Sequence, residues 1–136
     1  MTTLGFIGTG GMGQGMAANL IKAGYSVVVN DLNREQAKGL EEQGAQFVDT
    51  PKGVAESCDI VLSMLPNNDA VTQVGLGAGG LAEATGGAKL WIEFSSIDKA
   101  TIVGASDELG KTGWTVVDVG TGGVEEVAAA GQLALW

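Results

Sequence analysis

The amino-acid sequence predicts an α/β fold, in which a doubly wound and mostly parallel sheet carries helices on both faces. Short runs rich in β-branched residues alternate along the chain with longer amphipathic stretches, a pattern typical of right-handed βαβ units. The chain has 136 residues, of which 45% are hydrophobic, so a packed core is expected. Neither an internal repeat nor a linker divides the sequence, and we expect a single domain over residues 1–136.

Each expected element follows from the spacing of its hydrophobic residues and from the residues at its ends. The expected strands are residues 3–8, 25–30, 45–48, 59–65, 89–94, 114–119 and 132–136. The expected helices are residues 15–24, about 34–43, a helix that begins at Pro51, 68–74 and 98–109. The glycine-rich stretch 75–88 connects a helix to a strand and is expected to be a surface loop.

Residues at the helix ends support these boundaries. Gly24 can end the first helix. Asn33 is a candidate N-cap of the second helix, and Gln36, three residues later, can complete a capping box. Thr50 can cap the third helix, which has Pro51 at its first position, where the missing N–H of proline costs nothing.

Composition and charge exclude several classes of function. The 7 basic and 16 acidic residues give a net charge of −9, and such a surface repels DNA and RNA. The chain has no histidine, which removes a Ser-His-Asp triad and imidazole metal ligands. The lone cysteine, Cys58, excludes an internal disulfide and suits the reducing cytoplasm. We expect no membrane segment, because no apolar run approaches roughly 18 residues, and no secretory signal, because the N-terminus lacks its pattern.

The stretch GFIGTGGMGQGM, residues 5–16, is the main functional motif. Composition alone can produce it, since 23 residues are glycine, but here the glycines follow an expected strand and open an expected helix. Gly8 allows a tight turn, Gly10 lets the backbone approach a pyrophosphate, and Gly13 lets the helix pack closely on the strand. The helix N-terminus adds free N–H groups and a positive dipole end. The motif predicts a dinucleotide cradle, with a flexible turn as the alternative.

An acidic residue, Asp31, follows the second expected strand. A carboxylate at this place can accept hydrogen bonds from the adenosine ribose hydroxyls and repels a 2′-phosphate. The next residue is Leu32, not an arginine that would hold such a phosphate. The sequence therefore favours NAD over NADP, while Arg34 nearby keeps NADP as the alternative.

Four segments together resemble the β-hydroxyacid dehydrogenases, the group of 3-hydroxyisobutyrate dehydrogenase and tartronate semialdehyde reductase in the 6-phosphogluconate dehydrogenase superfamily. In order, they are GFIGTGGMGQGMAANLIKAGYSVVVND, DIVLSMLPNNDAV, WIEFSSID and VVDVGTGGVEEVAAAGQLAL. The resemblance covers essentially the whole chain. It implies a Rossmann-like NAD-binding domain of an oxidoreductase that transfers hydride between a nicotinamide cofactor and a small 3-hydroxy acid. The alternative is a stand-alone, non-catalytic NAD-binding module.

The resemblance also implies a set of cofactor contacts at the carboxyl ends of the strands. These residues are Gly8, Thr9, Gly10, Gly11, Met12, Gly13, Asn30, Asp31, Leu65, Pro66, Ser95 and Ser96. In the family, the backbone at Leu65 and Pro66 lies against the cofactor, and Ser96 approaches its nicotinamide side. The alternatives are a plain strand end for the first pair and a turn or helix cap for Ser95 and Ser96.

The segment DVGTGGV corresponds to the substrate loop of the family, but it is one residue shorter and lacks the family's proline. Thr121, Gly122 and Gly123 can hold a substrate carboxylate through a hydroxyl and backbone N–H groups, with a plain glycine turn as the alternative. The sequence does not name the hydroxy acid.

In the family, a lysine on a following helical domain relays the proton. No lysine of this chain matches that segment, so the resemblance implies that the helical domain is absent and that the chain alone is inactive. The face that packs on the helical domain would then be apolar, with Trp114, Leu133 or Trp136 exposed on it. We therefore expect self-association.

Overall fold

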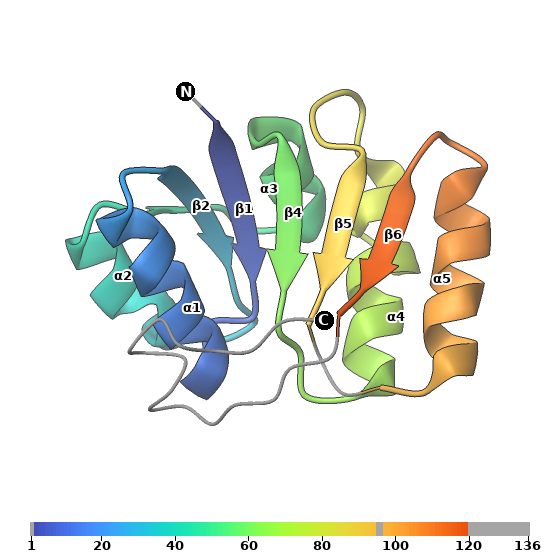
Figure 1. Ribbon diagram of the computed structural model, residues 1–136, viewed down its shortest axis with the longest axis horizontal. Helices are drawn as coiled ribbons and strands as arrows, with labels where there is room; N and C mark the ends of the chain where they lie inside the picture. Colours follow the sequence, from blue (N-terminus) through green and yellow to red (C-terminus); the bar gives the residue numbers. More distant parts are fainter. Residues whose placement is uncertain (1, 95–96, 120–136) are drawn as a thin grey trace.

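The computed structural model describes residues 2–94 and 97–119 of the chain. Within this part, six strands form one parallel sheet in the order β3-β2-β1-β4-β5-β6 (Figure 1). The strands are β1 (Thr3–Ile7), β2 (Ser26–Asn30), β3 (Gln46–Phe47), β4 (Ile60–Ser63), β5 (Leu90–Glu93) and β6 (Thr115–Asp118). The chain starts at β1 and builds outward in both directions, so the strand order reverses between β1 and β4. Open α/β sheets bind ligands at such a reversal.

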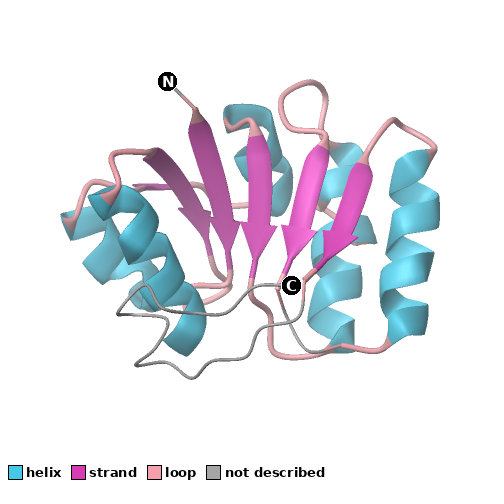
Figure 2. Cartoon of the chain, viewed as in Figure 1, coloured by secondary structure: helices cyan, strands magenta, loops and turns pink. Residues whose placement is uncertain are grey.

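Helices cover both faces of the sheet, as the sequence predicts (Figure 2). They are the α-helices α1 (Gly11–Lys22), α2 (Lys38–Glu42), α3 (Pro51–Ser57), α4 (Asn68–Leu76) and α5 (Lys99–Gly110), with the 3₁₀ turns η1 (Arg34–Ala37) and η2 (Leu81–Glu83). The first helix begins at Gly11, earlier than the expected start at residue 15. Its first turns pack on the sheet through Gly13 and Ala17, both buried, and this packing outweighs the low helix propensity of glycine.

Each face of the sheet has its own core, because side chains alternate between the two faces along every strand. On one face, Phe6 and Val29 pack with Ala17 of α1 and Leu40 of α2. On the other face, residues of α3, α4 and α5 pack around Trp91, whose side chain is fully buried.

Both predicted side-chain N-caps are present, but one predicted detail differs. The Thr50 hydroxyl accepts a hydrogen bond from the Gly53 N–H at 3.0 Å, at the start of α3. Asn33 caps η1 by accepting from the Glu35 N–H at 3.1 Å. The predicted capping box is wrong, however, because the Asn33 N–H donates to Asp31, at 2.8 Å, and not to Gln36.

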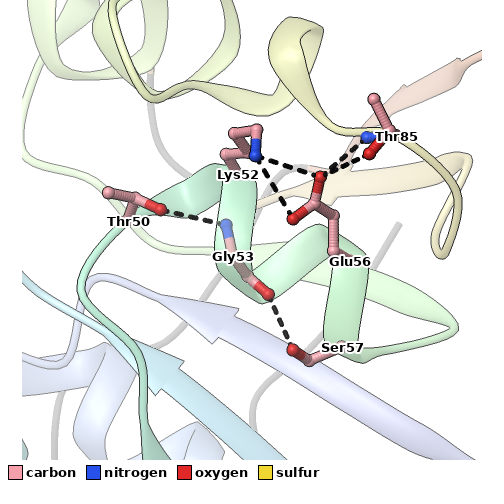
Figure 3. Close-up of polar contacts among 6 residues, drawn as sticks. All are labelled: Thr50, Lys52, Gly53, Glu56, Ser57 and Thr85. Carbon is pink, nitrogen blue, oxygen red and sulfur yellow. Dashed lines mark hydrogen bonds and ion pairs between the residues drawn. The ribbon is translucent and has the colours of Figure 1, made fainter.

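The segment 75–88 is not the plain surface loop that we expected. Its first residues complete α4, and Leu81 and Ala88 are buried in the core beneath α3 and α5. The Glu56 carboxylate on α3 accepts hydrogen bonds from the Thr85 N–H at 2.8 Å and from its hydroxyl at 3.0 Å (Figure 3). These contacts tie the segment to the body of the domain.

The expectation that Trp114 lies on an exposed apolar edge is wrong. Its side chain is only 5% exposed, and the Lys89 ammonium lies 5.7 Å from the centre of its ring. The tryptophan precedes β6 and turns inward to pack with α5, which closes that end of the core. Leu133, Trp136 and the expected strand over 132–136 lie outside the described residues.

Candidate functional site

A cavity of about 900 Å³ lies at the carboxyl ends of β1, β2, β3 and β4. The loops after these four strands and the first turns of α4 form its walls. Its described lining consists of Ile7, Gly8, Gly10, Gly11, Met12, Asn30, Asp31, Leu32, Arg34, Gln36, Phe47, Asp49, Thr50, Pro51, Met64, Leu65, Pro66, Ala70, Gln73, Val74 and Ala78. The volume is in the range of cofactor sites, and its place at the reversal of strand order is where such folds bind ligands.

Two glycines of the motif, Gly8 in the loop after β1 and Gly13 in α1, are required by the packing of the chain itself. Gly8 has a φ of +92°, and a Cβ on it would lie 2.2 Å from the carbonyl oxygen of Met64. A Cβ on Gly13 would lie 1.9 Å from the carbonyl oxygen of Gly8. Any side chain at either position would therefore push α1 or the loop after β4 away from the turn. The predicted tight turn and close helix packing are both present.

The third glycine of the motif, Gly10, is different. Its φ is −80°, and a Cβ on it would meet no atom closer than 3.8 Å, at the Gln36 side chain. Because Gly10 lines the cavity, the space above it is free for a ligand to approach the backbone. Nothing in the described part of the chain demands a glycine here, whereas a closely bound pyrophosphate would.

The N-terminus of α1 opens toward the same cavity. Its cap, Gly10, provides no side chain, and its first turn carries no acidic residue. By contrast, α3 and α4 are capped by hydrogen bonds to the side chains of Thr50 and Asn67. The first N–H groups of α1 therefore have no side-chain cap, and with the positive end of the helix dipole they suit a phosphate.

Asp31 is held in a fixed orientation at the wall of the cavity. Its Oδ2 accepts hydrogen bonds from the Thr9 N–H at 2.7 Å and from the Thr9 hydroxyl at 3.2 Å. Its Oδ1 accepts from the Asn33 N–H at 2.8 Å. A carboxylate has about four acceptor sites, so these bonds orient the group and leave capacity for ribose hydroxyls.

The structure brings most of the sequence-predicted residues together. Those that line the cavity are Gly8, Gly10, Gly11, Met12, Asn30, Asp31, Leu65 and Pro66. Thr9 and Gly13 lie behind this surface, where Thr9 is fully buried and holds Asp31. Asn30 is also buried, and its amide donates to the Val48 carbonyl at 2.8 Å, which joins β2 to the end of β3. Ser95, Ser96, Thr121, Gly122 and Gly123 lie outside the described residues.

Sequence reasoning missed the far wall of the cavity. Phe47 and Asp49 come from the short strand β3 and the loop after it, and Ala70 and Gln73 come from α4. The position of Phe47 at the carboxyl end of an expected strand was a usable signal. Ala70 lies in the segment DIVLSMLPNNDAV but was not proposed as a contact, and Gln73 lies outside the four segments. The packing of α4 against α5 and η2 brings both residues to the site.

Three further features of the described residues bear on function. No group of three acidic, cysteine or histidine residues there is arranged to hold a metal ion. Burial raises the pKa of the Cys58 thiol to about 11, so this cysteine is a poor nucleophile at neutral pH. The helices of residues 2–94 and 97–119 include none with the length and apolar character to cross a bilayer.

Comparison with known proteins identifies the family. Residues 3–136 match the family model of the NAD binding domain of 6-phosphogluconate dehydrogenase. The 3-hydroxyisobutyrate dehydrogenase of Pseudomonas aeruginosa is 39% identical over 134 residues, which are 98% of this chain and 45% of that protein.

Solved structures show the same fold. A 3-hydroxyisobutyrate dehydrogenase of Mycobacterium tuberculosis, solved with L-serine, has a TM-score of 0.89 and 30% identity, over 99% of this chain and 45% of that one. Psf3, solved with NADP+, has a TM-score of 0.89 and 25% identity, over 97% of this chain and 47% of that one. This chain spans less than half the length of each of these relatives.

Proposed function

The chain belongs to the family of NAD-binding domains of 6-phosphogluconate dehydrogenase and the 3-hydroxyisobutyrate dehydrogenases, and from this premise we propose its role. It is the cofactor domain of an oxidoreductase that transfers hydride between NAD and a small 3-hydroxy acid. The observation that carries this proposal is one cavity that combines a glycine turn, an uncapped helix N-terminus and a fixed carboxylate, Asp31. A non-catalytic module is not favoured, since the similar proteins are dehydrogenases.

The residues present fit a dinucleotide. The N–H groups at the start of α1 would bind the pyrophosphate, and Gly10 leaves the space for it. Asp31, oriented by Thr9, would accept hydrogen bonds from the adenosine ribose. Leu65 and Pro66 would place their backbone against the cofactor, and Ser95 and Ser96 would lie toward its nicotinamide end. When bound, NAD supplies the hydride acceptor.

Cofactor choice follows from the charge of Asp31. Its carboxylate would accept the 2′-hydroxyl of NAD but repel the 2′-phosphate of NADP. A second carboxylate, Asp49, lines the same cavity and adds to the negative field. We therefore propose NAD as the preferred cofactor of this chain.

The remaining parts of the proposal concern the whole enzyme. Residues 1–136 form one dinucleotide-binding domain, and Thr121, Gly122 and Gly123 bind the substrate carboxylate. The 136-residue chain by itself binds NADH without turnover, since no lysine in it matches the family's proton relay. The lone Cys58 suits a cytoplasmic location. Self-association stays a prediction, and sedimentation at rising protein concentration tests it.

Calorimetric titration with NADH and NADPH tests the proposed function. The wild-type chain should bind NADH more tightly than NADPH. Asp31→Ala should weaken NADH binding by about tenfold or more, because hydrogen bonds to a charged group are lost. Asp49→Ala is the matched control, since it removes an equal charge from the same cavity without touching Thr9. A wild-type chain that binds neither nucleotide would refute the proposal.

A further inference from the structure

One positively charged side chain, that of Arg34, lines the described part of the cavity. Arg34 opens η1, three residues after Asp31, so it is the nearest candidate to hold a 2′-phosphate on the adenosine ribose. The structure shows this guanidinium engaged elsewhere. Its Nη2 donates to Glu41 Oε1 at 3.0 Å, and its central carbon lies 4.6 Å from the centre of the Phe47 ring.

The two contacts of Arg34 come from different elements, and both hold its side chain in one place. Glu41 lies on α2 and Phe47 on β3. The planar guanidinium can therefore stack on the ring and reach the carboxylate at once, which restricts its rotamers. The Glu41 side chain is 26% exposed, against 64% for Arg34. Glu41 is therefore the more buried partner of the ion pair.

The charges around Arg34 decide what it can offer to a ligand. Glu41 neutralises Arg34, and the two other charged residues in the described lining of the cavity, Asp31 and Asp49, are both acidic. A phosphate placed here would meet a negative field and an arginine already paired. Asp31 alone would repel the phosphate, but an unpaired Arg34 would offset part of that repulsion.

We propose that Glu41 is a specificity-determining residue, which disfavours NADP by holding Arg34 in an ion pair on the Phe47 ring. Glu41 itself is a positioning residue, because it acts through Arg34. This inference rests on the proposed function, since it assumes that the cavity binds a nicotinamide dinucleotide. It adds a second determinant to Asp31, on a helix that carries no part of the glycine motif.

The test compares NADPH and NADH dissociation constants, measured by calorimetry on the 136-residue chain and its variants. Glu41→Gln should tighten NADPH binding by about three- to tenfold, in line with a partly exposed ion pair plus a removed repulsion. NADH binding should stay within about twofold, since both nucleotides share every other contact. The ratio of the two constants is the readout, because a general loss of structure would weaken both.

Glu42→Gln is the matched control. Glu42 is exposed on the same helix, and its removal changes the net charge equally without freeing Arg34. Arg34→Ala should leave NADPH binding of the wild-type chain nearly unchanged, but it should cancel the gain in the Glu41→Gln background.

Three results would overturn the inference. The first is an equal gain for Glu41→Gln and Glu42→Gln, which would reduce the effect to net charge. The second is an unchanged NADPH constant in Glu41→Gln while NADH still binds, which would leave the proposed function intact. The third is the absence of NADH binding by the wild-type chain, which would refute the proposed function and this inference together.

Discussion

Two glycine-rich regions of the molecule, the loop after β1 and the segment 75–88, use their glycines in different ways. In the later segment, a Cβ on Gly75 would lie 2.9 Å from the Trp91 ring, and one on Gly87 would lie 2.2 Å from the carbonyl oxygen of Ala55. In the loop after β1 and the first turn of α1, Gly13 is equally confined, but Gly10 faces open space on the cavity.

This difference teaches how to separate a structural glycine from a functional one. A glycine whose Cβ would clash within the chain is explained by the fold alone. A glycine with free space in front of it, on the wall of a cavity, is not required by a clash within the chain, and a ligand that approaches its backbone explains it. The comparison therefore predicts which substitutions affect stability, which affect cofactor binding, and which affect both.

The largest expected effect is that of Gly13→Ala, which should affect both. The new Cβ would overlap the Gly8 carbonyl oxygen, so the free energy of unfolding should fall by about 2–3 kcal/mol. NADH binding should also be lost, because the cradle is displaced. Urea unfolding and calorimetry measure the two effects. Gly87→Ala is the control, with a comparable loss of stability and an unchanged NADH constant. A Gly13→Ala variant as stable as wild type would contradict the prediction.

Next in size is Gly10→Ala, which should separate binding from stability. We expect NADH affinity to fall by about tenfold or more, since the methyl group occupies the space of the pyrophosphate. The free energy of unfolding should change by no more than about 0.5 kcal/mol, because no described atom lies within 3.8 Å of the new Cβ. Gly104→Ala, in open space within α5, should leave NADH binding unchanged and raise the free energy of unfolding by about 0.5–1 kcal/mol, because alanine has the higher helix propensity. Unchanged NADH binding in Gly10→Ala would remove the basis of the comparison.

A smaller effect on stability alone is expected for Gly75→Ala. The methyl group would press on the buried Trp91 ring, and the gain in helix propensity within α4 offsets part of the strain. The net loss should be about 1 kcal/mol, measured by urea unfolding. NADH binding should not change, because Gly75 does not line the cavity. A higher NADH dissociation constant in Gly75→Ala would show that the segment 75–88 is coupled to the loop after β1.

The smallest effect concerns the pH dependence of the contact between Glu56 on α3 and Thr85 in the segment 75–88. The Thr85 N–H, with its hydroxyl and Lys52, holds the pKa of Glu56 below its ordinary value of 4.5 (Figure 3). A lowered pKa in the folded state means that the contribution to stability is complete above about pH 4.5 and is lost as the pH falls below it.

Hydrogen exchange at the Thr85 amide checks this point. The protection of this amide should fall as the pH drops below about 4.5. Glu56→Gln should lower the protection at neutral pH and flatten its pH dependence. Glu83→Gln, on η2, should leave both unchanged. A Thr85 amide that stays protected in Glu56→Gln would show that the Glu56 contact is not needed to hold the segment 75–88 in place.

Much of the fold was predictable from the sequence because its signals are local. Hydrophobic spacing placed β1 through β6 within a few residues, and Thr50 with Pro51 marked the start of α3. The first helix was placed too late, because its early turns are stabilised by packing on the sheet and not by propensity. The buried Trp114 was also missed, since burial depends on what α5 packs against.

By itself, therefore, the sequence determined the α/β class, the order of the elements and the position of Gly8, Gly10 and Asp31 at one edge of the sheet. Only the tertiary structure decided which groups orient the charged side chains at that edge. Thr9 orients Asp31, and Glu41 with Phe47 holds Arg34. The physical reason is distance along the chain: each of these contacts joins residues of different elements, and a hydrogen bond or ring contact forms only where packing brings the two partners within a few ångströms.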